Sequence, residues 1–180
     1  MFANRLIVSI FEFFLSVVMS GFIIYLTYRV FIKANPDFNM EESIKKGNVA
    51  VGALVAVILV SASLILQKGL GSVVSMVRLY VSSPGENALP LWKIALLCLA
   101  HLGLSMVLAV ITISVTLRLF GKLVRSHMHA GEELERGNVA VGLVLSAVVL
   151  IAAMYVGEGV SAISSALVPQ PSIGQVEIMQ

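Results

Sequence analysis

Long apolar runs alternate with short polar connections along this chain. The four runs that are long enough to cross a bilayer cover residues 6–28, 47–67, 94–117 and 137–157. An α-helix rises 1.5 Å per residue, so about 20 residues cross the roughly 30 Å hydrocarbon core of a membrane. The runs lack the strict alternation of strands, and backbone groups in lipid must be satisfied within their own segment. The pattern therefore predicts an all-α integral membrane protein with four transmembrane helices.

The composition supports this class. Of the 180 residues, 58% are hydrophobic and 12% are charged, whereas soluble domains carry about 25% charged residues. The net charge of +2 is too small to indicate a nucleic-acid partner. The single cysteine, Cys98, can have no disulfide partner within the chain, and we expect it to be a packing residue. The lipid bilayer is thus the first partner that the sequence predicts.

The basic residues indicate how the chain is oriented. Eight of them flank the first and third connections: Arg29, Lys33, Lys45, Lys46, Arg118, Lys122, Arg125 and Arg136. The other four lie toward the opposite side: Arg5, Lys68, Arg78 and Lys93. The positive-inside rule then places the first and third connections in the cytoplasm and both termini outside.

A seven-residue phrase occurs twice with only its first residue changed, from lysine to arginine. Residues 46–52 read KGNVAVG, and residues 136–142, which lie 90 positions later, read RGNVAVG. Each copy follows a charged connection and begins a long apolar run. We therefore expect two tandem helical hairpins, residues 1–90 and 91–168, and a short tail at 169–180. Two crossings per hairpin return the chain to its starting side, which predicts a pseudo-two-fold axis along the membrane normal.

The connections carry their own local signals. Asn39 precedes Glu42 with the spacing of a capping box, and Pro36 ends the helix before it, so a short helix is expected in each charged connection. The segment 69–80 continues the apolar pattern, and we expect it to extend the second helix along the membrane surface to residue 81. Residues 82–85, Ser-Ser-Pro-Gly, predict a turn after it. The fourth helix is expected to extend to residue 168.

Tandem hairpins with a Gly-Asn-x-Ala motif at the start of each second helix resemble the uncharacterised bacterial inner-membrane proteins of domain-of-unknown-function family 350. The resemblance covers roughly residues 6–168. It implies a four-helix protein of the bacterial inner membrane built from two repeats. Together with the charge bias, it implies that both termini are periplasmic. The resemblance brings no established activity, so the function has to be argued from side chains.

Small residues follow each copy of the phrase on one helix face. Because residues four apart share a face, Asn48, Gly52 and Ala56 form one row, and Asn138, Gly142 and Ser146 form its counterpart. With the glycine that precedes each asparagine, the small residues of these rows predict a packing seam. Its members are Gly47, Gly52, Ala56, Gly137, Gly142 and Ser146. Small residues let helices approach closely within a bilayer. We therefore expect the second and fourth helices to pack against each other along these rows.

Asn48 and Asn138 stand at the polar entry of these two helices. Their amides could fix the entry of each helix by hydrogen bonds to a neighbour. They could instead line the mouth of a polar path, because an amide offers both donors and acceptors to an ion or to water. The packing interpretation is favoured, since a path needs more than a narrow polar mouth.

Ionisable residues within membrane-spanning segments are candidates for function. Four of them fall in the outer third of the predicted spans: Glu12, Lys68, His101 and Glu158. We expect a contact in at least one of the pairings Glu12–Lys68, His101–Glu158 and Lys68–Glu158. The favoured interpretation is a structural ion pair that fixes helix register. The alternative is a proton or cation relay, because histidine titrates near physiological pH.

Metal binding and catalysis receive little support. His127, His129, Glu132 and Glu133 are residue types that bind divalent metals, but the first hairpin has no equivalent histidines, so we expect no metal and no cofactor. We find no phosphate-binding loop, no Cys-x-x-Cys pair and no nucleophile with its base, and we do not expect an enzyme. The sequence favours a structural or accessory subunit of a homo- or hetero-oligomeric assembly. The alternative is a component of an ion or proton channel or transporter.

Overall fold

The computed structural model describes residues 2–32, 39–82, 90–125 and 128–167. All regular structure in these ranges is helical, which confirms the predicted all-α class. The elements are α1 (Phe2–Thr27), the π-helical segment η1 (Tyr28–Ile32), α2 (Met40–Lys45), α3 (Val49–Ser82), α4 (Leu91–Val124), α5 (Ala130–Glu135) and α6 (Val139–Leu167).

Four of these helical stretches are long and apolar enough to cross a membrane: Leu6–Ile32, Val49–Val81, Trp92–Val124 and Val139–Ile163. The chain is therefore a multi-pass membrane protein. All four stretches end beyond the predicted minimum spans, because apolar residues continue past the length needed for crossing. The second and fourth begin two residues later than predicted, at Val49 and Val139. In particular, α3 continues without a break through Gly69 to Ser82. Most of the predicted turn at 82–85 lies outside the described residues.

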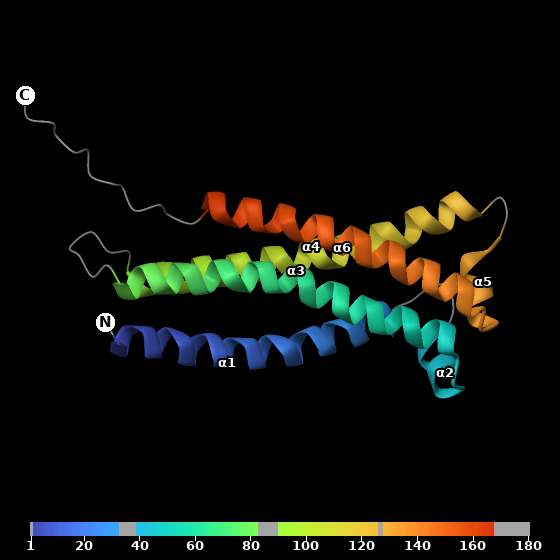
Figure 1. The fold of residues 1–180 in the computed structure, drawn as a ribbon, viewed down its shortest axis with the longest axis horizontal. Coiled ribbons are helices and arrows are strands. Elements are labelled where there is room, and N and C mark those ends of the chain that lie inside the picture. Colours follow the sequence, from blue (N-terminus) through green and yellow to red (C-terminus); the bar gives the residue numbers. More distant parts are fainter. Residues whose placement is uncertain (1, 33–38, 83–89, 126–127, 168–180) are drawn as a thin grey trace, which may run out of the picture.

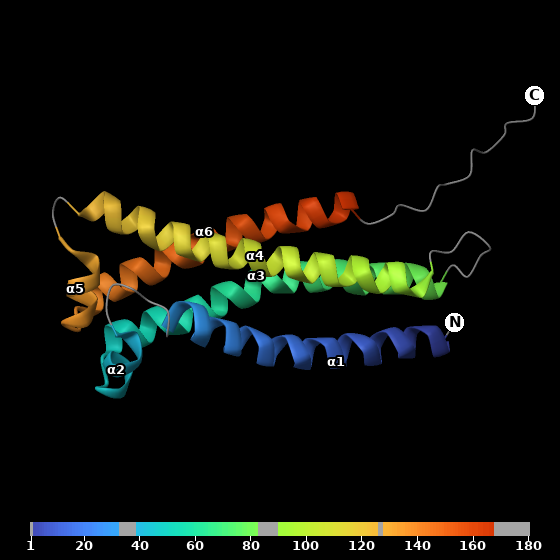
Figure 2. The ribbon, with the colours of Figure 1, turned by 180° about the vertical axis from the view of Figure 1, so that it is seen from behind.

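The long helices α1, α3 and α6 form a row with α3 in the middle, and α4 packs on one side of that row. In Figure 1 α4 lies behind α3, and in Figure 2 it lies in front. The most extensive contact joins α3 to α6, and the next joins α3 to α4. Because α1 packs mainly on α3, only 6% of the residues in the most apolar part of its span are buried.

The short helices α2 and α5 lie together at one end of the bundle, called here the α2/α5 end; the opposite end holds the N-terminus (Figure 1). The predicted capping by Asn39 is present, because its Oδ1 accepts a hydrogen bond from the backbone N–H of Glu42 at 3.1 Å. The Tyr28 hydroxyl donates to Glu41 Oε2 at 3.0 Å. This bond ties the end of the first span to α2.

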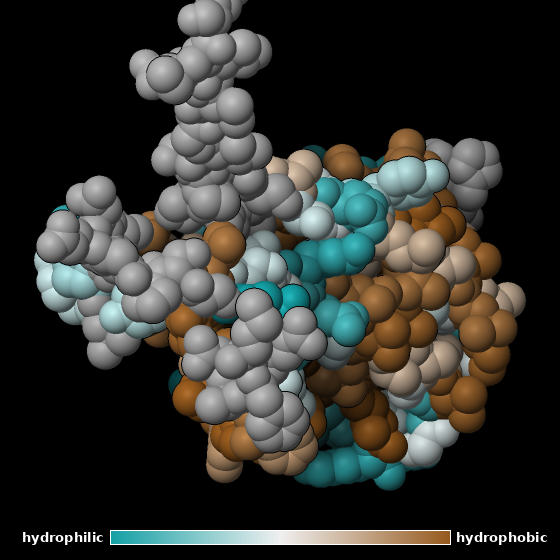
Figure 3. Space-filling model, turned by 60° about the vertical axis from the view of Figure 1, so that its left-hand side comes forward, coloured by the Kyte–Doolittle hydropathy of each residue, from teal (hydrophilic) through white to brown (hydrophobic). Residues whose placement is uncertain are grey.

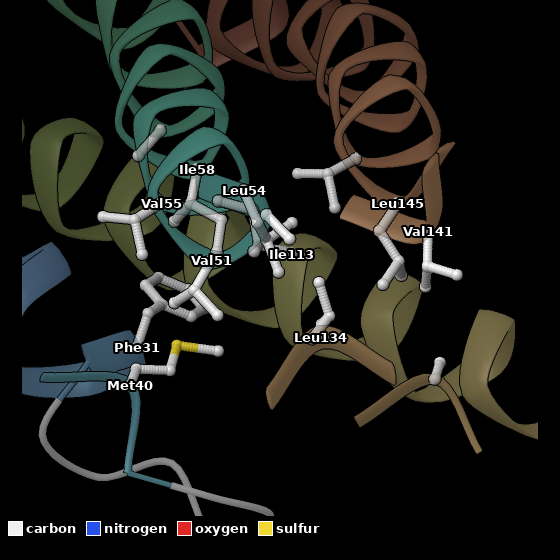
Figure 4. Packing of buried hydrophobic residues seen from close by; sticks show 14 residues of the cluster. Phe31, Met40, Val51, Leu54, Val55, Ile58, Ile113, Leu134, Val141 and Leu145 are labelled. Carbon is white, nitrogen blue, oxygen red and sulfur yellow. The ribbon is translucent and has the colours of Figure 1, made fainter. Parts of the chain in front are cut away.

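The largest core cluster lies toward the α2/α5 end (Figure 4). Its buried residues come from every element except α1, and Ile23 of α1 packs against it. It includes Phe31, Met40, Val51, Leu54, Ile58, Ile113, Leu134 and Leu145. A separate cluster at the N-terminal end joins Phe11, Leu15 and Met19 of α1 to Val73 and Met76 of α3. Since lipid tails are as apolar as these side chains, close packing rather than exclusion of water stabilises these contacts inside the membrane.

Candidate functional site

Both copies of the repeated phrase fold into the same corner between a short helix and a long one. Gly47 and Gly137 adopt φ values of 78° and 84°, in the left-handed region. The N–H groups of Gly47 and Asn48 donate to carbonyls of α2 at 2.9 and 3.0 Å, and those of Gly137 and Asn138 donate to carbonyls of α5 at 3.0 and 2.9 Å. These bonds form a Schellman motif, the usual way to end a helix at glycine.

The asparagine after each glycine begins the long helix. Asn48 Oδ1 accepts from the backbone N–H of Val51 at 3.1 Å, and Asn138 Oδ1 accepts from that of Val141 at 3.4 Å. Each side chain thus satisfies one of the N–H groups that a helix start leaves without an intrahelical partner. The repeated phrase therefore encodes the end of one helix and the start of the next.

We expect Gly137→Ala to destabilise the protein by roughly 1–2 kcal/mol, which is the usual cost of a left-handed L residue. Space does not limit the substitution, because an added Cβ would meet only Asn48 atoms at 3.9 Å or beyond. Gly137→Asn is the control, since asparagine tolerates this region better. Thermal unfolding in mild detergent measures both. Equal losses for the two variants would contradict the conformational explanation.

The two asparagine amides differ in what else they bind. Asn48 Nδ2 donates to the carbonyls of Leu134 and Glu135 at 2.7 and 3.1 Å, and so connects the start of α3 to the end of α5. Asn138 Nδ2 donates to Glu133 Oε2 at 2.8 Å, within its own half of the chain. Both amides are engaged as donor and as acceptor in holding the fold. An ion passing beside them would have to compete with these bonds.

A hollow of about 310 Å³ separates the two corners, with Glu42, Lys46, Glu135 and Arg136 in its lining. Charges of both signs meet there: Lys46 Nζ lies 2.7 Å from Glu42 Oε1 and lowers the pKa of the Glu42 carboxyl. Arg136 pairs with Glu133 at 3.3 Å. Exposed pairs of this kind contribute little to stability, and their mixed charge does not favour one class of ligand.

α3 and α6 approach closely where Gly142 faces Ala50. A Cβ added to Gly142 would lie 2.7 Å from the Ala50 carbonyl oxygen and 2.9 Å from its Cα. Ser146, one turn later on α6, is buried. The first copy differs, because an added Cβ at Gly52 would meet nothing within 4 Å, and Ala56 is exposed.

The prediction of a seam therefore needs correction for Gly52 and Ala56. α3 is rotated so that Ala50 rather than Gly52 faces α6, which leaves the first small-residue row outside the contact. At this crossing α3 and α6 therefore contact each other through different positions of the repeated phrase. The pseudo-two-fold axis stays a prediction.

The structure joins two of the four ionisable residues singled out above. Lys68 Nζ of α3 lies 2.7 Å from Glu158 Oε1 of α6. The two side chains remain 42% and 72% exposed, although both residues lie within membrane-spanning stretches. Glu12 is exposed on α1 and makes no ion pair within the described residues. The pairings Glu12–Lys68 and His101–Glu158 are not among the ion pairs of the described part of the chain.

His101 is instead buried, with 3% of its surface exposed. Its Nδ1 lies 2.9 Å from the Leu97 carbonyl, while Nε2 has no hydrogen-bond partner among the residues described. The Ser105 hydroxyl donates to the His101 carbonyl at 2.8 Å. Ser105 also lies directly against Gly69, because a Cβ added there would come within 2.7 Å of the Ser105 Cβ. His101 thus lies one turn from a close crossing of α3 and α4.

Two serine hydroxyls share this lack of partners. Ser61 Oγ on α3 and Ser146 Oγ on α6 are buried and make no hydrogen bond in the described ranges. The sequence carries no signal for Ser61, because helical serines usually donate to a carbonyl of their own preceding turn. Only the packing shows that Ser61 does not.

An apolar groove of about 610 Å³ lies beside the Lys68–Glu158 pair. Leu64 of α3 and Met154 and Tyr155 of α6 are in its lining. The groove could accept aliphatic or aromatic groups from lipid or from another membrane protein, next to one fixed pair of charges.

No group of three or more metal-binding side chains occurs among the residues that the structure describes. His127 lies outside them, and His129 stands at the start of α5. The expected absence of a metal and of a cofactor stays a prediction.

The long apolar helices and the short helices that join them at one end define a polytopic α-helical membrane protein. The chain belongs to the family described as Domain of Unknown Function (DUF350), whose model matches residues 2–160. This confirms the family to which the sequence pointed. No curated protein and no solved structure matches the chain.

Proposed function

We propose that this protein is a non-enzymatic structural or accessory subunit of a membrane assembly, formed with further copies or with other membrane proteins. The observation that supports this proposal most strongly is the exposed Lys68–Glu158 ion pair between α3 and α6. Charged side chains inside a membrane almost always face protein or water, because lipid cannot solvate them. A further protein surface over this pair would supply that environment.

The shallow packing of α1 supports the same proposal. Only 6% of the residues in the most apolar part of its span are buried, and α1 packs mainly on α3. In a bilayer, helix association depends on packing and on interhelical hydrogen bonds rather than on the hydrophobic effect. A helix that packs mainly on one neighbour therefore has most of its surface available to another subunit.

A component of an ion or proton path is the second candidate. It is favoured by three buried polar atoms without partners in the described residues: His101 Nε2, Ser61 Oγ and Ser146 Oγ. Buried polar groups are normally hydrogen-bonded, and water or a transported ion would satisfy them. Four helices enclose little space, so this candidate also requires an assembly.

The proposal predicts that Glu158→Gln shifts the gently extracted assembly toward smaller species, while the helical circular-dichroism signal of each subunit is retained. The substitution leaves Lys68 without its counter-charge, and an unpaired charge at a buried contact costs more than the pair is worth. Size-exclusion chromatography in mild detergent measures the shift. Glu132→Gln is the control, because it changes an exposed acid at the α2/α5 end.

A transport role predicts a different result for the same variants. In that case Glu158→Gln and Glu12→Gln would leave the assembly intact and abolish ion flux into liposomes. An intact assembly with lost flux would therefore contradict the accessory role and support the second candidate.

A further inference from the structure

One face of α3 carries polar and small residues through the part of the span near the N-terminal end. The row consists of Ser63, Gln67, Gly71, Ser75 and Arg78, and all five are exposed. Intervals of three and four residues place them on one side of the helix. Gly69, which packs against Ser105 of α4, lies about half a turn around the helix from Gln67 and from Arg78. The polar row therefore faces away from α4.

α1 adds a carboxylate on the same side. Its contact with α3 uses Phe11, Leu15 and Met19, and Glu12 lies on the helix flank next to these residues. α1 and α3 run antiparallel, and both are right-handed. This geometry turns Glu12 toward the side of the α1–α3–α6 row that lacks α4, the side that faces the viewer in Figure 1. The opposite flank of α1, with Ile10, Phe14 and Val18, is apolar.

Glu12 and Arg78 also lie at a similar depth. Phe11 and Leu15 share a packing cluster with Met76 and Val73, so Glu12 lies within about one helical turn of Arg78 along the bundle axis. Neither residue makes an ion pair in the described part of the chain. Figure 3, which looks toward the N-terminal end, shows hydrophilic groups crossing an otherwise hydrophobic surface.

We infer that this face binds a second copy of the chain, with α1 of each copy packed on α3 of the other and Glu12 paired with Arg78 of the other copy. Copies inserted in the same orientation are related by a rotation about the membrane normal, which preserves depth. A two-fold rotation that brings the acid to the base therefore makes the pair twice. Gly71 and Ser75 allow the helices to approach closely.

Charge complementarity selects a second copy as the occupant. The face supplies one acid and one base at the same depth, so it is complementary to itself under the two-fold rotation, as an isologous interface requires. The inference rests on the proposed function and specifies one contact of the assembly. It leaves the Lys68–Glu158 pair and its groove on the α6 side free for a further subunit.

Disulfide formation between two differently tagged copies tests the arrangement. Both copies carry Cys98→Ala, which removes the single native cysteine; one copy also carries Ser16→Cys and the other Gly71→Cys. Ser16 lies one turn after Glu12 and at the depth of Gly71, so oxidation in native membranes is expected to link the two tags. Val18→Cys is the matched control, because it lies on the apolar flank and is 65% exposed. It is expected not to link to Gly71→Cys.

Charge reversal tests the pairing itself. Glu12→Arg or Arg78→Glu alone is expected to weaken the dimer by about thirtyfold, or about 2 kcal/mol, since two intramembrane polar pairs are lost. The double variant is expected to restore it. Failure of the double variant to recover, or absence of the Ser16→Cys to Gly71→Cys link, would overturn the inference. If the protein still belongs to a larger assembly, the proposed function survives; a lone chain overturns both.

Discussion

Gly142→Ala is expected to destabilise the protein by about 1–3 kcal/mol, the usual cost of adding volume to a packed contact. The added methyl group would lie 2.7 Å from the Ala50 carbonyl oxygen, which belongs to backbone and cannot rotate away. α3 and α6 would have to separate, and they form the most extensive contact of the fold. Unfolding of the purified protein by increasing concentrations of a denaturing detergent measures the change in stability.

Gly52→Ala is the matched control and is expected to change the stability in the opposite direction. It occupies the same place in the first copy of the phrase, but an added Cβ meets nothing within 4 Å. Alanine is the better helix former by about 1 kcal/mol, so a small gain in stability is expected. Equal effects at Gly142 and Gly52 would contradict the asymmetric crossing.

Asn48→Ala is expected to cost about 2–3 kcal/mol. The substitution removes an N-cap, which is worth about 1 kcal/mol. It also removes two hydrogen bonds from the Asn48 side chain to backbone carbonyls, each worth about 1 kcal/mol before relaxation. Those carbonyls belong to Leu134 and Glu135, at the end of α5. The loss would therefore loosen the joint between the two halves at the α2/α5 end. Thermal unfolding and hydrogen exchange of α5 measure it.

Asn138→Ala removes the equivalent cap without breaking a bond between the halves. Its Nδ2 binds only Glu133, five residues earlier, among the described residues. We expect a loss of roughly 1–2 kcal/mol and little added exchange in α2. A loss equal to that of Asn48→Ala would mean that the contact between the halves adds no stability.

The local structure of the repeated phrase was readable from sequence because neighbouring residues determine it. A glycine after a short helix and an asparagine before a long apolar run are sufficient to predict a helix end and a helix start. The structure shows both, with left-handed φ at Gly47 and Gly137. The same reasoning gave the four membrane-spanning helices, since length and hydropathy decide them.

The packing of the phrase could not be predicted in the same way. Gly52 and Gly142 each end an identical six-residue stretch, GNVAVG, yet only Gly142 lies against another backbone. The rotation of each helix depends on all the side chains of its partners, and the flanking residues of the two copies differ. Periodicity shows which residues share a face, but it does not show what that face meets.

The ionisable residues show the same limit. Helical rise gave an approximate depth for Glu12, Lys68, His101 and Glu158, but a contact also depends on the direction in which each residue points around its helix. Lys68 and Glu158 point toward each other from parallel helices. His101 points into the packing between helices, and Glu12 points to the surface.

The mass of the assembly, released gently from its membrane and measured by native mass spectrometry, tests the proposed subunit role most directly. One chain has a mass of 19.2 kDa. The proposal predicts a particle that contains at least two protein chains, either copies of this one or this chain with a different membrane protein. A particle of one chain, with lipid as its sole companion, would contradict it.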